Sequence, residues 1–133
     1  MRRALRFRAL QHLFLCLAPL RAPELVGAHN ASSSTLEVEW IHLPEEHFRG
    51  EPIGYIIKYY PVESEGDFNV VSVKYRTNTV SLTNLSIYTM YVIILSAESS
   101  GGIGPANTIE ARTDAEGTYI YMYIYIQNNQ FFC

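Results

Sequence analysis

The side chains best suited to chemistry are histidines near the middle of the chain. His42 and His47 lie beside Glu45 and Glu46, and His29 stands apart from them. A zinc site takes three or four ligands at set spacing, and a nucleophile needs a base and a group that orients this base. Neither pattern is present, and no serine falls in a G-x-S-x-G turn. We therefore expect no catalytic residue, no metal ligand and no cofactor.

Two further clusters have structural interpretations. Glu63, Glu65 and Asp67 form an acidic turn, but Ca²⁺ requires oxygen ligands that converge from several positions. The glycine-rich stretch 99–105 precedes a predicted strand, whereas a phosphate-binding loop precedes a helix. We expect the acidic turn to keep the protein soluble and the glycines to give a hairpin loop its backbone freedom.

Charge, composition and cysteine usage limit the class of protein. The chain has 133 residues, which is the size of one domain. Hydrophobic residues make up 48% of it and charged residues 17%, a composition too apolar for a disordered protein. Residues 23–133 carry five cations against thirteen acids, a net charge of −8, so we expect no nucleic-acid partner. Cys16 and Cys133 lie near the ends, and the middle must be held by packing without disulfides.

The first 22 residues resemble a targeting segment. Arginines come first, an apolar run follows at residues 13–20, and Ala22 stands near the expected cleavage point. This order is typical of a secretory signal peptide, although Arg21 does not fit the usual small residue. We interpret residues 1–22 as a signal peptide or an unstructured leader. The apolar run is too short to span a bilayer, which needs about 20 residues.

Residues 115–133 are interpreted as a linker and a tail outside the domain. The segment TYIYMYIYI, residues 118–126, alternates Tyr with Ile or Met and has no charge. As protein it is a strand that is apolar on both faces, which predicts edge-to-edge pairing and aggregation. Alternating Tyr, Ile and Met codons also spell a dinucleotide-type DNA repeat. We therefore interpret the tail as translated non-coding sequence, and the chain as a fragment of a longer multidomain protein.

Between these ends, apolar residues recur with a period of two and short turns separate the segments. This pattern predicts strands and no helix. Seven strands in about 90 residues favour an all-β fold, a seven-stranded antiparallel β-sandwich of immunoglobulin-like type. The predicted strands are residues 23–29, 35–40, 53–60, 68–75, 79–82, 89–97 and 107–113.

Four motifs follow one another along this region. They are Leu36-x-Val38-x-Trp40, Gly54-Tyr55-x-Ile57-x-Tyr59, Leu82-x-x-Leu85-x(5)-Tyr91-x-Ile93-x-Leu95-x-Ala97 and Gly102-x-Gly104-Pro105. Their order and spacing resemble a fibronectin type III domain over residues 23–114. The spacing from Leu85 to Tyr91 resembles the family's tyrosine corner, in which the hydroxyl bonds nearby backbone. The expected structural core comprises Trp40, Tyr55, Leu82, Leu85 and Tyr91.

The resemblance implies a non-catalytic interaction and spacer module in an extracellular adhesion molecule or receptor ectodomain. Its partners would be an unidentified protein and the neighbouring domains of the parent chain. An intracellular elastic spacer of a muscle or cytoskeletal protein stays open, as does an accessory module of a receptor phosphatase or other enzyme. Loops on a rigid sandwich carry binding, so we expect these residues to face a partner: Ser99, Ser100, Gly101, Gly102, Ile103, His47, Phe48 and Arg49.

Two sequons agree with an extracellular location. Asn30-Ala31-Ser32 and Asn84-Leu85-Ser86 match the N-x-[ST] acceptor pattern. Both fall at predicted turns, where a glycan has room. We expect Asn30 and Asn84 to be glycosylation sites.

Overall fold

The computed structural model describes residues 17–113 and 123–125 of the chain. Within these residues the elements are strands, apart from one helical turn. In chain order they are β1 (Glu24–Ser32), β2 (Thr35–Ile41), α2 (Glu45–Phe48), β3 (Pro52–Pro61), β4 (Asn69–Lys74), β5 (Thr79–Leu82), β6 (Met90–Ser99), β7 (Gly102–Arg112) and β8 (Tyr123–Tyr125).

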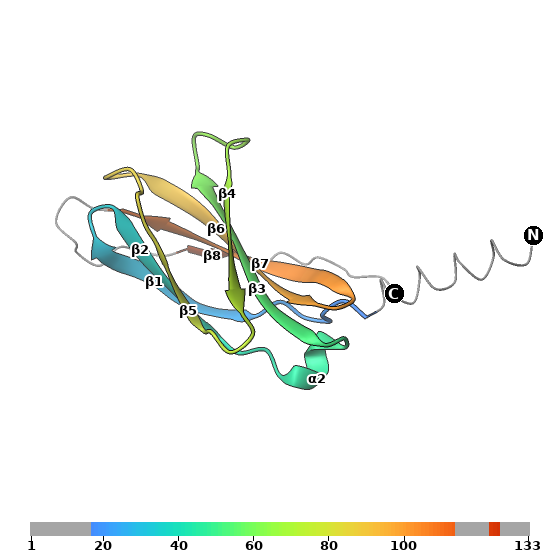
Figure 1. Ribbon diagram of the computed structural model, residues 1–133. Helices are drawn as coiled ribbons and strands as arrows, with labels where there is room; N and C mark the ends of the chain where they lie inside the picture. The colour runs from blue at the N-terminus through green and yellow to red at the C-terminus, as the bar shows by residue number, and fades with distance from the viewer. Residues whose placement is uncertain (1–16, 114–122, 126–133) are drawn as a thin grey trace, which may run out of the picture.

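The strands form two antiparallel sheets that pack face to face (Figure 1). One sheet has the strand order β1-β2-β5, and the other has the order β4-β3-β6-β7-β8. The predicted seven-stranded antiparallel sandwich is confirmed by β1 to β7. β3 to β4 and β6 to β7 are hairpins within the larger sheet, and the chain changes sheet between β2 and β3.

Several element boundaries differ from the sequence prediction. β1 continues to Ser32, over residues predicted as a turn, because its pairing with β2 runs on to Thr35. β7 begins at Gly102, inside the predicted glycine-rich loop, because Ser99 and Gly102 close a tight hairpin. The predicted polar loop 44–52 contains α2. β8 adds an eighth strand from the segment assigned to the tail.

Alternation along β2 shows how the sequence selects the interior. Leu36, Val38 and Trp40 are at most 1% exposed, whereas Glu39 is exposed and Ile41 is 51% exposed. Successive side chains of a strand point to opposite faces, so the apolar set faces the other sheet. All five residues expected in the core are buried, with at most 7% exposure, namely Trp40, Tyr55, Leu82, Leu85 and Tyr91.

Aromatic rings fill one end of the space between the sheets. The ring centroids of Trp40 and Tyr55 lie 5.3 Å apart, and those of Phe48 and Tyr55 lie 6.0 Å apart. Phe48 also meets Tyr75 edge-on at 5.2 Å. Centroid separations of about 4.5–7 Å in tilted or edge-to-face geometry are the favourable arrangement for aromatic pairs. The cluster therefore joins β2, α2, β3 and the residue that follows β4.

Two buried tyrosine hydroxyls fasten loops to this core. The Leu43 N–H donates to the Tyr55 hydroxyl at 3.0 Å, and the Ser86 N–H donates to the Tyr91 hydroxyl at 2.8 Å. The second bond spans the turn after Leu85, as the tyrosine-corner spacing predicted. Burial disfavours the charged phenolate and raises the pKa of Tyr55, while the bond from Leu43 opposes this shift.

We expect Tyr55→Phe to lower the free energy of unfolding by about 1–3 kcal/mol, because the buried Leu43 N–H loses its acceptor. The pKa of Tyr55 is higher in the folded than in the unfolded chain. The contribution of the neutral Tyr55 hydroxyl to the free energy of unfolding is therefore fully present below about pH 10 and is lost as the pH rises further. Denaturant titrations from pH 8 to 11 should show a shallower alkaline decline in Tyr55→Phe than in the natural chain.

Tyr59→Phe is the matched control for this experiment. Tyr59 is also buried on β3, and no hydrogen bond to its hydroxyl is recorded among the described residues. It should lower the free energy of unfolding less than Tyr55→Phe does, because no buried N–H loses its acceptor. Equal slopes for the natural chain and Tyr55→Phe would contradict the role given to burial of this hydroxyl.

Candidate functional site

The structure brings together the two loops that were expected to face a partner. Loop 44–52 and loop 99–105 meet at the end of the sandwich where β1 begins. The Ser100 N–H donates to the Glu51 carbonyl and the Glu51 N–H donates to the Ser100 hydroxyl, both at 2.9 Å. The two loops therefore form one surface.

This surface is occupied by the chain's own residues 17–20, which we call the incoming segment. The Ser99 hydroxyl donates to the Leu17 carbonyl at 2.8 Å, and the Arg49 Nε–H donates to the Ala18 carbonyl at 3.0 Å. The Leu20 N–H donates to the carbonyl of His47 at 2.8 Å. Three main-chain groups of the incoming segment are thus held by the two loops.

Two glycines make the close approach possible. A Cβ at Gly101 would overlap the backbone of Leu17, and one at Gly104 would lie 2.6 Å from the Pro19 carbonyl oxygen. Ala18 is 2% exposed and Pro19 is also buried. The glycines were expected to supply backbone freedom. At Gly101 and Gly104 a side chain is excluded because the incoming segment lies where the Cβ would be. The spacing of the glycines in the sequence does not reveal this contact.

These contacts correct part of the partner-facing prediction. Phe48 is 0% exposed because it packs into the aromatic cluster, and Ser99 is 2% exposed because it bonds the incoming segment. His47, Arg49 and Gly101 contact that segment as well. The exposed members of the set are Ser100, Gly102 and Ile103.

The incoming segment also bears on the predicted leader. Residues 17–22 were assigned to the leader, and the structure packs residues 17–20 against the sandwich. Residues 1–16 lie outside the described part of the chain, so the signal peptide itself stays a prediction. The predicted cleavage point near Ala22 would remove residues that the two loops hold.

The histidines do not assemble a catalytic or metal centre among the described residues. His42 and His47 line a depression of about 290 Å³ together with Arg21 and Glu24. The His42 Nδ1 lies 3.4 Å from the Tyr55 hydroxyl. No group of three or more His, Cys, Asp or Glu side chains within residues 17–113 is placed to hold a metal ion. The arrangement provides polar contacts between a loop and the core.

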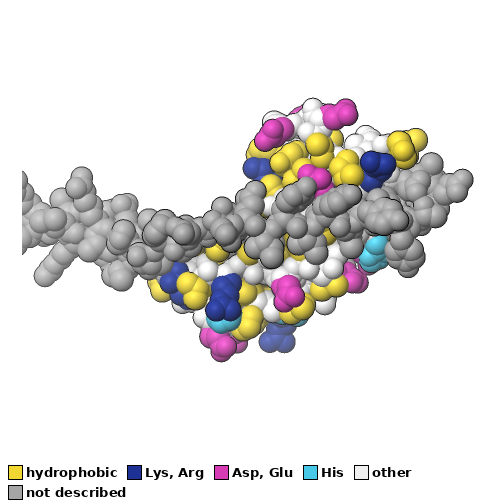
Figure 2. All heavy atoms as spheres, turned by 180° about the vertical axis from the view of Figure 1, so that it is seen from behind, with side chains coloured by type: hydrophobic (Ala, Val, Ile, Leu, Met, Phe, Trp, Pro, Cys, Tyr) yellow, Lys and Arg dark blue, Asp and Glu magenta, His cyan; other side chains and the backbone are white. Residues whose placement is uncertain are grey.

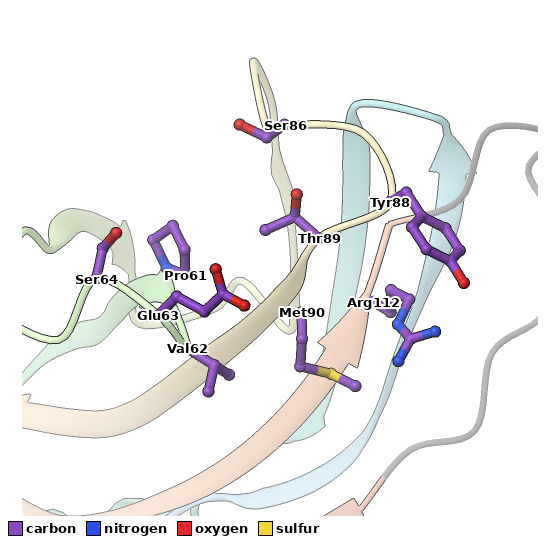
Figure 3. A pocket seen from close by; sticks show the side chains of 9 residues that line it. All are labelled: Pro61, Val62, Glu63, Ser64, Ser86, Tyr88, Thr89, Met90 and Arg112. Carbon is purple, nitrogen blue, oxygen red and sulfur yellow. The ribbon is translucent and has the colours of Figure 1, made fainter.

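A larger pocket of about 510 Å³ lies at the opposite end of the sandwich (Figure 3). We call it the Arg112 pocket; it is lined by Pro61, Val62, Glu63, Ser64, Ser86, Tyr88, Thr89, Met90 and Arg112. The Arg112 guanidinium carbon lies 5.1 Å from the centre of the Tyr88 ring, a cation–π contact. One carboxylate, Glu63, and one guanidinium, Arg112, share the lining with hydroxyl-bearing and apolar side chains.

Beside this pocket, hydrogen bonds hold the backbone where it leaves β7, as they hold the incoming segment at the other end. The Thr113 N–H donates to the Thr89 carbonyl at 2.9 Å, and the Thr89 N–H donates to the Thr113 hydroxyl at 3.0 Å. Thr113 also bonds the carbonyl of Ser86 and is 0% exposed. Sequence reasoning missed this residue because a threonine at the end of a strand carries no distinctive spacing.

The two sequons lie in different environments. Asn84 is exposed in a bend with a φ of 57°, in the left-handed region that asparagine tolerates. Asn30, predicted to lie in a turn, is instead half-buried within β1, opposite Leu36 on β2. A glycan has more room at Asn84.

The face shown in Figure 2 bears no single-sign charge patch on the described residues. Acidic and basic side chains are interspersed there with apolar ones.

Comparison with known proteins decides the family. The family model described as the fibronectin type III domain matches residues 21–112. The chain belongs to the fibronectin type III family. This family match covers β1 to β7 and excludes residues 118–126, which we call the Tyr/Ile segment.

The relatives of this fibronectin type III chain are much longer proteins. It is 26% identical over 106 residues to the cell adhesion molecule Dscam1 of Drosophila melanogaster, covering 76% of this chain and 5% of that protein. It is 31% identical over 100 residues to the putative receptor-type tyrosine-protein phosphatase mosPTP-1 of Aedes aegypti, covering 73% and 8%. The fn3 domain of human contactin 1 is similar in structure, with a TM-score of 0.64 at 35% identity over 73% of this chain and 80% of that one.

Within the described residues, no helix has the length and apolarity needed to cross a membrane.

The close packing of the incoming segment predicts the effect of Gly101→Ala in the full chain. The added methyl overlaps Leu17, so the segment should be displaced at a cost of about 1–3 kcal/mol. Because cleavage by a protease follows the population of the open form, trypsin should cut after Arg21 faster in the variant. Mass spectrometry of timed digests measures this rate.

Gly66→Ala is the control, since a Cβ at Gly66 meets no atom within 4 Å. It should leave cleavage after Arg21 unchanged. If Gly101→Ala and Gly66→Ala are cut at the same rate, the incoming segment is not held by the glycine-rich loop.

Proposed function

We propose that this chain is a non-catalytic interaction and spacer module of an extracellular adhesion molecule or receptor ectodomain. The observation that carries the proposal is the restraint of the backbone where it enters and where it leaves the seven-stranded sandwich, at opposite ends. Residues 17–20 are held by the loops at one end, and Thr113 is held beside the Arg112 pocket at the other. A module that fixes both the incoming and the outgoing backbone sets the distance and direction between whatever it joins.

The relatives support the adhesion or receptor setting. One is a cell adhesion molecule and another is a putative receptor-type phosphatase, and the chain spans at most 8% of either protein. A module of this size in such a protein acts as one unit among many. Because one fold hosts many functions, the partner has to be argued from surfaces. The exposed Ser100, Gly102 and Ile103 and the Arg112 pocket are the surfaces offered here.

An accessory module of a receptor phosphatase is the second candidate. It is favoured by the 31% identity to the putative receptor-type tyrosine-protein phosphatase. In that setting the catalytic part lies in another domain, and this chain keeps the same spacer role. The two candidates differ in the protein that carries the module rather than in what the module does.

A replacement experiment tests the spacer role. Residues 17–113 would replace the matched repeat of Dscam1 in cells that lack it. We expect the chimera to reach the cell surface and to keep the adhesion of the parent molecule, because the replacement preserves the fold and both pinned ends. Cell aggregation and surface staining measure the two properties.

The same chimera with Trp40→Ala is the control. Loss of this 1%-exposed ring should cost about 3–5 kcal/mol and reduce surface display. A natural chimera that is displayed at the parental level yet supports no adhesion would contradict a spacer role at that position.

The extracellular setting predicts unequal glycosylation of the two sequons. In the full chain expressed with an appended secretion signal, Asn84 should carry a glycan at higher occupancy than Asn30, because Asn84 is exposed and Asn30 is half-buried within β1. Asn84→Gln and Asn30→Gln distinguish the sites by mass spectrometry after glycosidase treatment. An unmodified Asn84 in secreted protein would count against the extracellular proposal and favour the intracellular spacer.

A further inference from the structure

Among the four domain strands of the larger sheet, β4 and β7 are the outer ones, so one side of the β7 backbone faces away from β6. The first part of this side is closed to another strand. Pro105 has no N–H to offer, and the Asn107 side chain donates to the carbonyl of Pro23 at 2.6 Å. Residues 108–110 are the next part of the strand along the chain.

β8 lies along these residues (Figure 1). In antiparallel register Thr108 pairs with Tyr125, Ile109 with Ile124 and Glu110 with Tyr123. An edge strand presents unpaired N–H and C=O groups that accept such a neighbour. In this register the aliphatic Ile124 pairs with Ile109, which is 0% exposed, and Tyr125 pairs with Thr108, which is 7% exposed. Tyr123 pairs with the half-buried Glu110. A shift of the register by one residue would pair Ile109 with a tyrosine instead.

We propose that residues 108–110 of β7 are a strand-addition site for an extended, uncharged segment of alternating aromatic and aliphatic residues. In this chain the occupant is its own segment Tyr123–Tyr125, bound in cis.

The connection between the strands favours the cis occupant over a second copy. β7 ends at Arg112 and β8 begins at Tyr123, so residues 113–122 link the site to its occupant. Pairing across a connection of this length is intramolecular, with an effective concentration on the order of millimolar. The entropic cost of closing a loop rises only slowly with its length. A second molecule at micromolar concentration cannot match this.

The opposite edge of the same sheet does not offer an equivalent site. β4, the edge strand, carries Lys74 at its end. A lysine on an edge strand discourages the addition of another strand. Among the described strands, β7 rather than β4 has the added partner.

The proposal changes what is expected of the Tyr/Ile segment. Its alternation predicted pairing between molecules and aggregation. Pairing in cis gives partners to the backbone groups of residues 108–110 that face β8 and to the groups of β8 that face β7, and it leaves β8 as the outer strand of the sheet. The edge of β7 should therefore be protected in the monomer at micromolar concentration.

Amide hydrogen exchange of the full chain, measured by NMR, tests the site. Ile124→Pro removes the N–H of the central β8 residue. Residues 108–110 alternate between β6 and β8 as bonding partners, so the amides that face β8 should exchange about tenfold faster in Ile124→Pro. Ile124→Gly, which keeps the N–H, should give a smaller increase. Ile120→Pro places the same change outside β8 and should leave these rates unaltered.

The outcomes separate the possible occupants. Faster exchange in Ile124→Pro with unchanged rates in β3 and β6, and a monomer by sedimentation, supports the cis site. Equal rates at residues 108–110 in the natural chain, Ile120→Pro and Ile124→Pro overturn it. A natural chain that protects these amides only as a dimer, losing protection on dilution, overturns the cis occupant in favour of a second copy. An unfolding midpoint shared by the natural chain and both proline variants shows that the sandwich itself is intact.

Discussion

Packing of Trp40 against Tyr55 between the sheets is the contact on which the rest of the structure depends. Their ring centroids lie 5.3 Å apart, and each ring comes from a different sheet. Two sheets that pack face to face are separated by about 10 Å, a gap that large rings fill. The module has no disulfide in this region, so apolar burial between the sheets must supply the stability that covalent links give to small disulfide-rich domains.

The aromatic cluster also determines the shape of one end of the molecule. Phe48 packs on Tyr55 and Tyr75, and this burial draws α2 onto the end of the sandwich. With α2 in place, the His47 carbonyl and the Arg49 side chain face the incoming segment and hold it. A core contact thus governs how the chain approaches the domain, through one helical turn that connects interior and surface.

The sequence was sufficient to predict the fold because apolar residues alternate along β2, β3 and β6, and in a strand this alternation places the apolar side chains on one face, where they are buried. It was sufficient for Tyr91 because a hydroxyl five residues from its donor is a short-range contact. It was not sufficient for Phe48 or Ser99. Both lie in stretches rich in polar residues and glycine, and their burial depends on contacts with residues distant in the chain, Tyr55 and Leu17. Asn30 was misplaced for the same reason, since pairing with β2 extends β1 beyond its apolar positions.

The two ends of the sandwich differ in a way that bears on a spacer role. At one end the loops pack on the incoming segment, and the backbone at Gly101 and Gly104 lies so close to this segment that no side chain would fit. At the other end the outgoing Thr113 is pinned while the adjacent Arg112 pocket stays open. β7 connects these ends over 11 residues, a span of about 36 Å at the usual rise of a strand. In the proposed spacer role, a strand held at both ends would transmit orientation along the chain, and the open pocket would be available to another surface.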